Sequence, residues 1–106
     1  MKKSVSILAT LALVALVASP VARADQAAAQ KAGCLACHSV DKKLVGPAFK
    51  DVAAKSKGQA DAVAKLTDKV RKGGAGVWGQ IPMPPNPEAK INDAELKTVV
   101  EWILKG

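Results

Sequence analysis

Apolar side chains along the chain recur mainly at the spacing of an α-helix. One such stretch is the alanine-rich segment that follows Asp25 and ends at Ala32, and another runs from about Ala60 to Arg71. The first stretch continues directly into the cysteines, and Ala28, Ala32 and Leu35 are spaced to share one helical face. In the second stretch Val63, Leu66 and Val70 share one. This spacing is typical of amphipathic helices that pack one stripe of side chains inward.

The clearest helix start lies near the C-terminus, at Asn92. Asn92 and Glu95 have the spacing of a capping box, in which the first side chain accepts a hydrogen bond from the main-chain N–H of the second residue. Ile91 and Leu96 are placed to form a hydrophobic staple across the same helix start. The buried stripe of this helix would then consist of Leu96, Val99, Val100 and Ile103.

Between these helices the chain loses its periodicity twice. From Ser39 to Pro47 we expect a loop, followed by a short helix from about Ala48 to Lys55 that ends before Gly58. The segment from Gly73 to Pro87 holds four glycines and four prolines, which excludes a regular element. Loops of this length are uncommon in small domains and usually have a function. Because no segment alternates with the two-residue period of a strand, the pattern predicts an all-α domain.

The first 24 residues have the organisation of a secretory signal peptide. Lys2 and Lys3 precede an apolar run from Ile7 to Ala18 and a small-residue site at 22–24. A membrane anchor is the competing interpretation, but the run is shorter than the about 20 apolar residues that span a membrane. We therefore expect cleavage after Ala24, export to the periplasm and a single domain formed by residues 25–106.

The expected mature chain is small and mildly basic. Three of the sixteen basic residues and none of the nine acidic residues lie in the first 24 positions, so residues 25–106 carry a net charge of +4. These 82 residues contain one Phe, two Trp and no Tyr, and a chain of this size has barely enough core of its own. A buried apolar cofactor would supply core that the side chains lack. No dense basic run or basic patch with interleaved aromatic residues occurs, which argues against nucleic acid as a partner.

The strongest chemical signal is the sequence Cys-Leu-Ala-Cys-His at residues 34–38. Two cysteines separated by two residues and followed directly by His are the attachment pattern of haem c. The thiols of Cys34 and Cys37 would add to the two haem vinyl groups, and His38 would lie beneath the iron as its proximal ligand. A thioredoxin-type dithiol or a disulfide is one alternative, but the βαβ context of such a dithiol is not found. A zinc site needs four ligands, whereas this chain has two Cys and one His.

A six-coordinate haem iron needs a second axial ligand, for which Met83 is the candidate. After residue 24 it is the only Met, and His38 is the only His. Pro82, Pro84 and Pro85 surround Met83 and restrict the main chain, which would hold the thioether sulfur in place. The alternative is a methionine that fills a gap in the core, but a proline-rich loop is an unusual place for one.

With these motifs the chain resembles the short bacterial class I cytochromes c of the cytochrome c-551 type, over essentially all of residues 25–106. The residues that carry the resemblance are Gly33 with the cysteine motif, Val45 to Phe49, Gly76 to Gly79 and Ile81 to Asn86. The resemblance implies a fold of about four helices wrapped around one covalently bound haem c. It also implies that the protein is an electron carrier and not an enzyme.

The resemblance further implies roles for four residues around the haem. The carbonyl of Pro47 would accept a hydrogen bond from the proximal imidazole, and Asn86 would donate one to the sulfur of Met83. Arg71 and the indole N–H of Trp78 would bind a haem propionate. Without the resemblance, these four would be interpreted as a turn residue, a loop cap, a solvated charge at a helix end and a plain core residue.

Two further positions concern the packing of the terminal helices. Gly33 lacks a Cβ and would permit close approach of the last helix, where Trp102 would contribute most of the packing area. Relatives commonly carry a large aromatic residue five positions before the first cysteine, where this chain has Ala29. Looser packing of the terminal helices and a less stable apoprotein are therefore expected.

A protein of this family would exchange single electrons with transient redox partners. The donor would be a membrane or periplasmic reductase and the acceptor a terminal oxidase, nitrite reductase or peroxidase, with the protein a monomer without a stable membrane anchor. Lysines that would steer acidic partner faces are Lys31, Lys42, Lys43 and Lys72. Two other functions stay open. One is a gas-binding or enzymatic haem protein in which Met83 does not ligate, and the other is an exported dithiol protein without haem.

Overall fold

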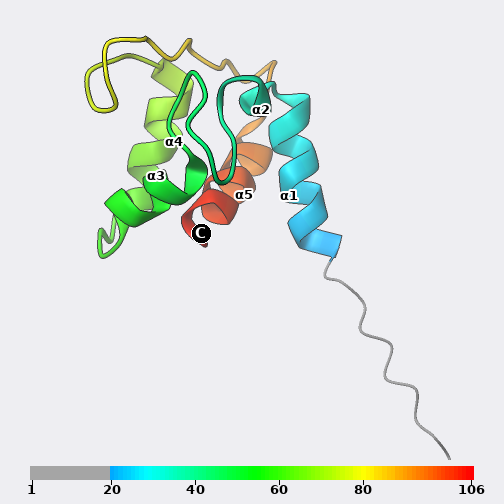
Figure 1. The fold of residues 1–106 in the computed structure, drawn as a ribbon. Coiled ribbons are helices and arrows are strands. Elements are labelled where there is room, and N and C mark those ends of the chain that lie inside the picture. Colours follow the sequence, from blue (N-terminus) through cyan, green and yellow to red (C-terminus); the bar gives the residue numbers. More distant parts are fainter. Residues whose placement is uncertain (1–19) are drawn as a thin grey trace, which may run out of the picture.

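The structure is a computed structural model that describes residues 20–106 (Figure 1). The signal peptide expected at residues 1–24 lies largely outside this range, so its cleavage stays a prediction. The helices are α1 (Pro20–Lys31), α2 (Cys34–Cys37), α3 (Phe49–Ser56), α4 (Ala62–Lys72) and α5 (Asp93–Leu104). Residues 20–106 contain no β-strand and only an isolated antiparallel bridge between Gly74 and Met83, which confirms the all-α prediction. In this described part of the chain, no helix is long and apolar enough to cross a membrane.

The helix boundaries differ from the expected ones mainly at the N-terminal end. α1 begins at Pro20 and continues through Asp25 without interruption, whereas we expected it to begin after Asp25. Proline suits the first turn of a helix because its φ is already helical and its missing N–H has no intrahelical partner there. The bounds of α3 and α4 lie within one or two residues of the expected ones.

Helix α5 is central to the fold, since α1, α3 and α4 all pack against it (Figure 1). The buried cluster formed at these contacts consists of Ala29, Ala32, Ile91, Leu96, Val99 and Val100. Partly buried residues that pack against the cluster include Val63, Leu66, Val70, Trp102 and Ile103. The apolar stripes predicted for α4 and α5 are thus their inward faces.

The start of α5 has the predicted cap. The main-chain N–H of Glu95 donates to Asn92 Oδ1 at 2.8 Å. The return contact joins the two side chains, with Asn92 Nδ2 donating to Glu95 Oε1 at 2.8 Å. Ile91 and Leu96 are 2% and 1% exposed and belong to the same buried cluster, as a hydrophobic staple requires. Both sequence signals for this helix start are confirmed.

The reason expected for Gly33 was wrong. Gly33 separates α1 from α2 with a φ of 82°, a left-handed conformation that glycine adopts without steric cost. A Cβ at this position would meet only the end of the Lys90 side chain, at 3.8 Å, and no atom of α5. Gly33 is therefore suited to the sharp turn that redirects the chain into the cysteine helix, and not to close approach of the last helix.

Candidate cofactor site

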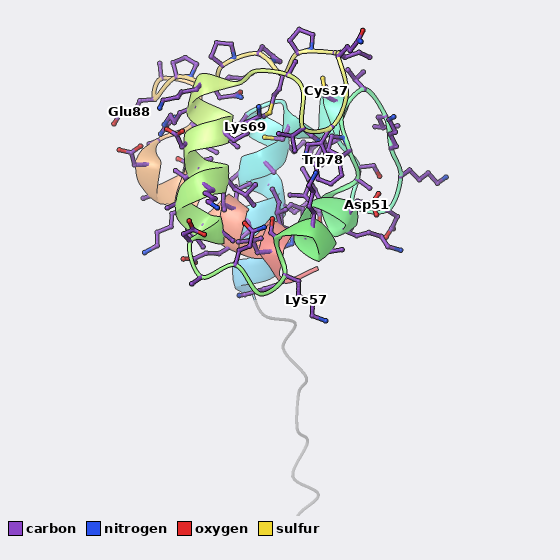
Figure 2. All side chains as sticks on the ribbon, turned by 90° about the vertical axis from the view of Figure 1, so that its left-hand side faces the viewer. Cys37, Asp51, Lys57, Lys69, Trp78 and Glu88 are labelled. Atoms are coloured by element: carbon purple, nitrogen blue, oxygen red, sulfur yellow. The ribbon has the colours of Figure 1, made fainter. Side chains whose placement is uncertain are left out.

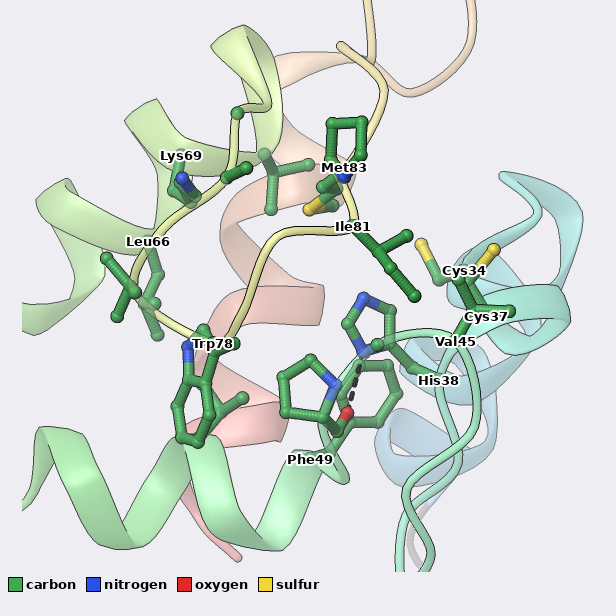
Figure 3. A pocket seen from close by; sticks show the side chains of 18 of the residues that line it. Cys34, Cys37, His38, Val45, Phe49, Leu66, Lys69, Trp78, Ile81 and Met83 are labelled. Atoms are coloured by element: carbon green, nitrogen blue, oxygen red, sulfur yellow. Dashed lines mark hydrogen bonds between the residues drawn. The ribbon is translucent and has the colours of Figure 1, made fainter.

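A cavity of about 290 Å³ opens between α4, α5, the long loop 73–87 and the segment that follows the cysteines. Its wall is mainly apolar and includes Phe49, Leu66, Val99 and Val100. The four residues that the sequence marked for haem attachment and ligation all line it: Cys34, Cys37, His38 and Met83. Figure 3 shows the Met83 side chain and the His38 imidazole reaching into this space from different segments, with the two cysteine sulfurs together at one edge. The structure thus brings the loop residue next to the cysteine motif.

The two cysteines occupy one short helical turn. α2 runs from Cys34 to Cys37, which are three positions apart and so project from the same side of the turn. Both are free and half-buried. Burial raises the pKa of the Cys34 thiol, and the positive charge of Lys90 offsets part of that rise. Because both thiols are free and project from one turn, both sulfurs are available at one edge of the cavity, as attachment to two neighbouring vinyl groups requires.

The imidazole of His38 is held by two contacts. Its Nδ1 lies 2.8 Å from the carbonyl oxygen of Pro47. A carbonyl oxygen only accepts, so Nδ1 carries the proton and donates, which leaves Nε2 with its lone pair. The ring also stacks on Phe49, with centroids 5.1 Å apart and the planes at 21°. The contact expected with Pro47 is present, and it defines which nitrogen can bind a metal.

Gly46 makes room for the His38 ring. A Cβ on Gly46 would lie 2.5 Å from Cε1, 2.8 Å from Nδ1 and 3.0 Å from Nε2 of the imidazole. The main-chain N–H of Gly46 donates to the carbonyl of Cys37 at 2.7 Å, so the loop cannot easily move away. Glycine is needed here because of the close approach of a side chain, and not because of an unusual φ.

Gly46→Ala should displace the His38 imidazole from Pro47. We expect a loss of stability of about 1–3 kcal/mol, the usual cost of overpacking, seen as a lower melting temperature by circular dichroism. The NMR shifts of the His38 ring should change as well. Lys42→Ala, an exposed position in the same loop, is the control and should change neither quantity. Ring shifts equal to those of the control would contradict this account of Gly46.

The main chain of Met83 is attached to the end of α4. The N–H of Gly74 donates to the Met83 carbonyl and the N–H of Met83 donates to the Gly74 carbonyl, each at 2.9 Å. Met83 is half-buried and lines the cavity, but it does not belong to the buried cluster around α5. Its position therefore fits a ligand better than the alternative of a core-filling methionine.

Trp78 lines the cavity from the long loop and lies beside α3 (Figure 2). Lys55 of α3 places its Nζ over the indole, 4.6 Å from the ring centroid, in a cation–π contact. Trp78 is 39% exposed, so it is not a plain core residue. The propionate contact expected of its indole N–H stays a prediction.

Arg71 and Asn86 lie outside the wall of the cavity as the structure describes it. Asn86 is 5% exposed, and its Nδ2 donates to the carbonyls of Val70 at 3.1 Å and Pro84 at 3.2 Å, so both amide protons are used. The guanidinium of Arg71 is bound to main-chain carbonyls and to a carboxylate. Two expected contacts therefore stay predictions: that of Arg71 with a propionate and that of Asn86 with the Met83 sulfur. Each would require the residue to give up hydrogen bonds that it makes in this structure.

Unlike Arg71, Lys69 of α4 does line the cavity, and the sequence reasoning missed it (Figure 3). The signal was present in the helical spacing. Leu66, Lys69 and Val70 are at i, i+3 and i+4, so a cation at 69 shares the inward face, whereas one at 71 does not. The role of Arg71 was implied by the resemblance, whereas the face of the helix favours Lys69.

Comparison with known proteins decides what this arrangement is. The family model described as cytochrome c matches residues 22–106. The chain belongs to the cytochrome c family. Among curated relatives, cytochrome c-551 of Allochromatium vinosum is 52% identical over 94 residues, which cover 89% of this chain and 98% of the relative. Cytochrome c-552 of Nitrosomonas europaea is 48% identical over 97 residues, with 92% of both chains covered.

Solved structures of this cytochrome c family agree with the fold. The crystal structure of wild-type Nitrosomonas europaea cytochrome c552 has a TM-score of 0.70 at 49% identity, covering 76% of this chain and 96% of that one. The class 1 cytochrome MtoD from Sideroxydans lithotrophicus ES-1 has a TM-score of 0.69 at 36% identity, covering 78% and 92%. The small all-α cytochrome c fold is therefore confirmed.

Membership of the cytochrome c family makes haem c the covalently bound cofactor of this chain and electron transfer its role. The described residues fit that group on their own evidence. The cavity has an apolar wall, two free thiols at one edge and an imidazole whose Nε2 retains its lone pair. The attachment pattern of Cys34 and Cys37 agrees with this cofactor.

Proposed function

We propose that the protein is a periplasmic single-electron carrier whose haem iron is ligated by His38 and Met83. One observation carries the proposal: the 2.8 Å contact of His38 Nδ1 with the Pro47 carbonyl leaves Nε2 to act as a ligand atom. The Pro47 carbonyl also raises the basicity of the imidazole. Met83 lines the same cavity from the long loop, where it can complete the coordination.

Two protein ligands favour a carrier over an enzyme. The bound haem supplies a one-electron change at its iron. With His38 and Met83 both ligating, no position is left open for a substrate. The Pro47 carbonyl and the prolines around Met83 restrict both ligands, so little movement would accompany a change of oxidation state. The thioether ligand and the apolar wall both favour the ferrous state and raise the reduction potential.

For the propionate groups we propose two residues of the cavity wall. The indole N–H of Trp78 would donate to one carboxylate, and the Lys55 ammonium above the ring would hold the indole in place. Lys69 would supply the positive charge that a partly buried carboxylate needs. This role is supported by the position of Lys69 on the face of α4 that lines the cavity, together with Leu66.

Transient redox proteins are the partners that we propose, with a reductase as donor and a terminal oxidase, nitrite reductase or peroxidase as acceptor. The rim of the cavity supports short-lived contacts, since several apolar residues there are 48–69% exposed: Leu44, Val45, Val77 and Ile81. Lys42 and Lys43 are exposed beside this rim and would attract acidic faces. Export is supported by the signal-peptide pattern of residues 1–24.

The first test is the visible and near-infrared absorption of the wild-type haem protein in both oxidation states. His–Met ligation predicts a weak sulfur-to-iron charge-transfer band in the ferric protein and no rapid binding of carbon monoxide to the ferrous protein. Absence of the band, or ready binding of carbon monoxide, would mean an open sixth position and favour a gas-binding or enzymatic haem protein. A colourless purified protein would favour the dithiol alternative.

A further inference from the structure

Arg71, at the end of α4, joins three segments that are distant in the sequence. Its Nη1 donates to the carbonyls of Asn86 at 3.1 Å and Ile91 at 2.7 Å. Its Nη2 forms an ion pair with Asp93 Oδ1 at 2.5 Å. The Arg71 side chain is only 21% exposed, whereas that of Asp93 is 81% exposed. The guanidinium is therefore a largely shielded link between α4, the loop that carries Met83 and the start of α5.

Asn86 is the loop residue whose carbonyl accepts from Arg71, and it also donates hydrogen bonds to α4. Its main-chain N–H donates to the carbonyls of Val70 at 3.1 Å and Arg71 at 3.3 Å. Its side chain donates to Val70 and to Pro84, the residue that follows Met83. Arg71 thus accepts from Asn86 through its carbonyl and donates to Asn86 through its guanidinium, which closes a ring of contacts.

The main chain between Met83 and Asn86 makes few other hydrogen bonds that could fix its position. Upstream, the hydrogen-bond pair with Gly74 holds the main chain of Met83. The next two residues, Pro84 and Pro85, have no N–H to donate. The contacts of Asn86 with α4 are therefore the downstream anchor of the ligand segment 83–86. Hydrogen bonds from a charged donor such as Arg71 are stronger than neutral ones.

We propose that Arg71 is a positioning residue for Met83, which clamps the ligand segment 83–86 to the end of α4 and holds the sulfur at the iron. This role rests on the proposed ligation by Met83. It differs from a role in binding a haem propionate, because the guanidinium is engaged away from the cavity and Lys69 occupies the inward face of α4. Arginine suits the clamp since its planar fork can address two carbonyls and a carboxylate together.

The test compares Arg71→Gln with Lys72→Gln in the ferric haem protein. Both variants remove one positive charge from neighbouring positions, but Lys72 is exposed and pairs only with Asp68 in the described part of the chain. Added imidazole competes with Met83 for the iron, and its binding is followed by loss of the sulfur-to-iron band. We expect Arg71→Gln to bind imidazole about tenfold more tightly than wild type and Lys72→Gln to bind it as wild type does. Amide hydrogen exchange at Asn86 should accelerate only in Arg71→Gln.

The outcomes separate this role from its competitors. Equal imidazole affinity in the two variants overturns the proposal. It does so even if the melting temperature of Arg71→Gln falls, because Arg71 would then stabilise the fold without positioning Met83. A changed pH dependence of the reduction potential with unchanged imidazole affinity would assign Arg71 to a propionate instead. If Arg71→Gln does not fold, Arg71→Lys replaces it: a lysine keeps the charge but not the fork, so raised imidazole affinity supports the clamp and wild-type affinity overturns it. If the wild-type ferric protein lacks the sulfur-to-iron band, the proposed ligation by Met83 is itself wrong.

Discussion

Met83→Ala is expected to abolish the sulfur-to-iron band of the ferric protein and to let the ferrous protein bind carbon monoxide. Alanine has no ligand atom, so the sixth position of the iron becomes available. The reduction potential should fall by on the order of 0.1 V, a modest part of the about 0.8 V range that axial ligands span. Absorption spectroscopy and a redox titration measure both effects.

Two further variants make the Met83 experiment specific. Met83→His keeps six ligands but exchanges the thioether for an imidazole, so the potential should fall while carbon monoxide binding stays slow. Gln59→Ala changes an exposed, uncharged side chain that does not line the cavity and should leave the band and the potential as in wild type. A band that survives in Met83→Ala would exclude Met83 as the ligand.

Gly73→Ala is expected to remove the loop from its place on α4. Gly73 has φ 67° and ψ −153°, a combination that is essentially restricted to glycine. A Cβ there would overlap the Met83 carbonyl oxygen and lie 2.9 Å from main-chain atoms of Pro84 and Pro85. Backbone strain of about 1–2 kcal/mol and overpacking of about 1–3 kcal/mol together predict a loss of roughly 3 kcal/mol.

The Met83 carbonyl accepts from Gly74, so the displacement in Gly73→Ala should also weaken the proposed ligation by Met83. The measurements are thermal unfolding of the ferric haem protein and the intensity of its sulfur-to-iron band. Gly58→Ala is the matched control: Gly58 also has a positive φ, 82°, but a Cβ there meets no atom within 4 Å. It should lose the strain energy alone and keep the band. If both variants lose stability equally and keep the band, the contact of Gly73 with the loop is unimportant.

Several features could be predicted because each depends on neighbours in the sequence. The cap of α5 needs only Asn92 and Glu95, which are three residues apart, and the structure contains it. The cysteine pair and His38 lie within five residues, so one helical turn brings the sulfurs together. The stripes of α4 and α5 follow from helical periodicity, since the face that excludes water must be apolar.

Other features depend on where distant segments meet, and the sequence did not give them. The role expected for Gly33 was wrong, because the segment nearest to it is Lys90 and not α5. The haem contacts that the resemblance implies for Asn86 and Arg71 stay predictions, and the structure adds partners that the sequence did not indicate: carbonyls of α4, of the long loop and of Ile91. Lys69 was overlooked although its helical face was computable from spacing. In each case tertiary contacts determine which atoms are within reach.

The sequence by itself determined the helices, the attachment motif, the two candidate ligands and the absence of strands in the folded region. These follow from local spacing and composition, which act through contacts of a few residues. The contact of His38 with the Pro47 carbonyl was implied by the resemblance, and the structure contains it. Only the tertiary structure decided that Gly46 makes room for the ring and that the link from Arg71 to Asn86 ties the loop of Met83 to α4. Hydrogen-bond partners depend on which main-chain carbonyls the packed helices bring within about 3 Å, and no sequence spacing encodes that distance.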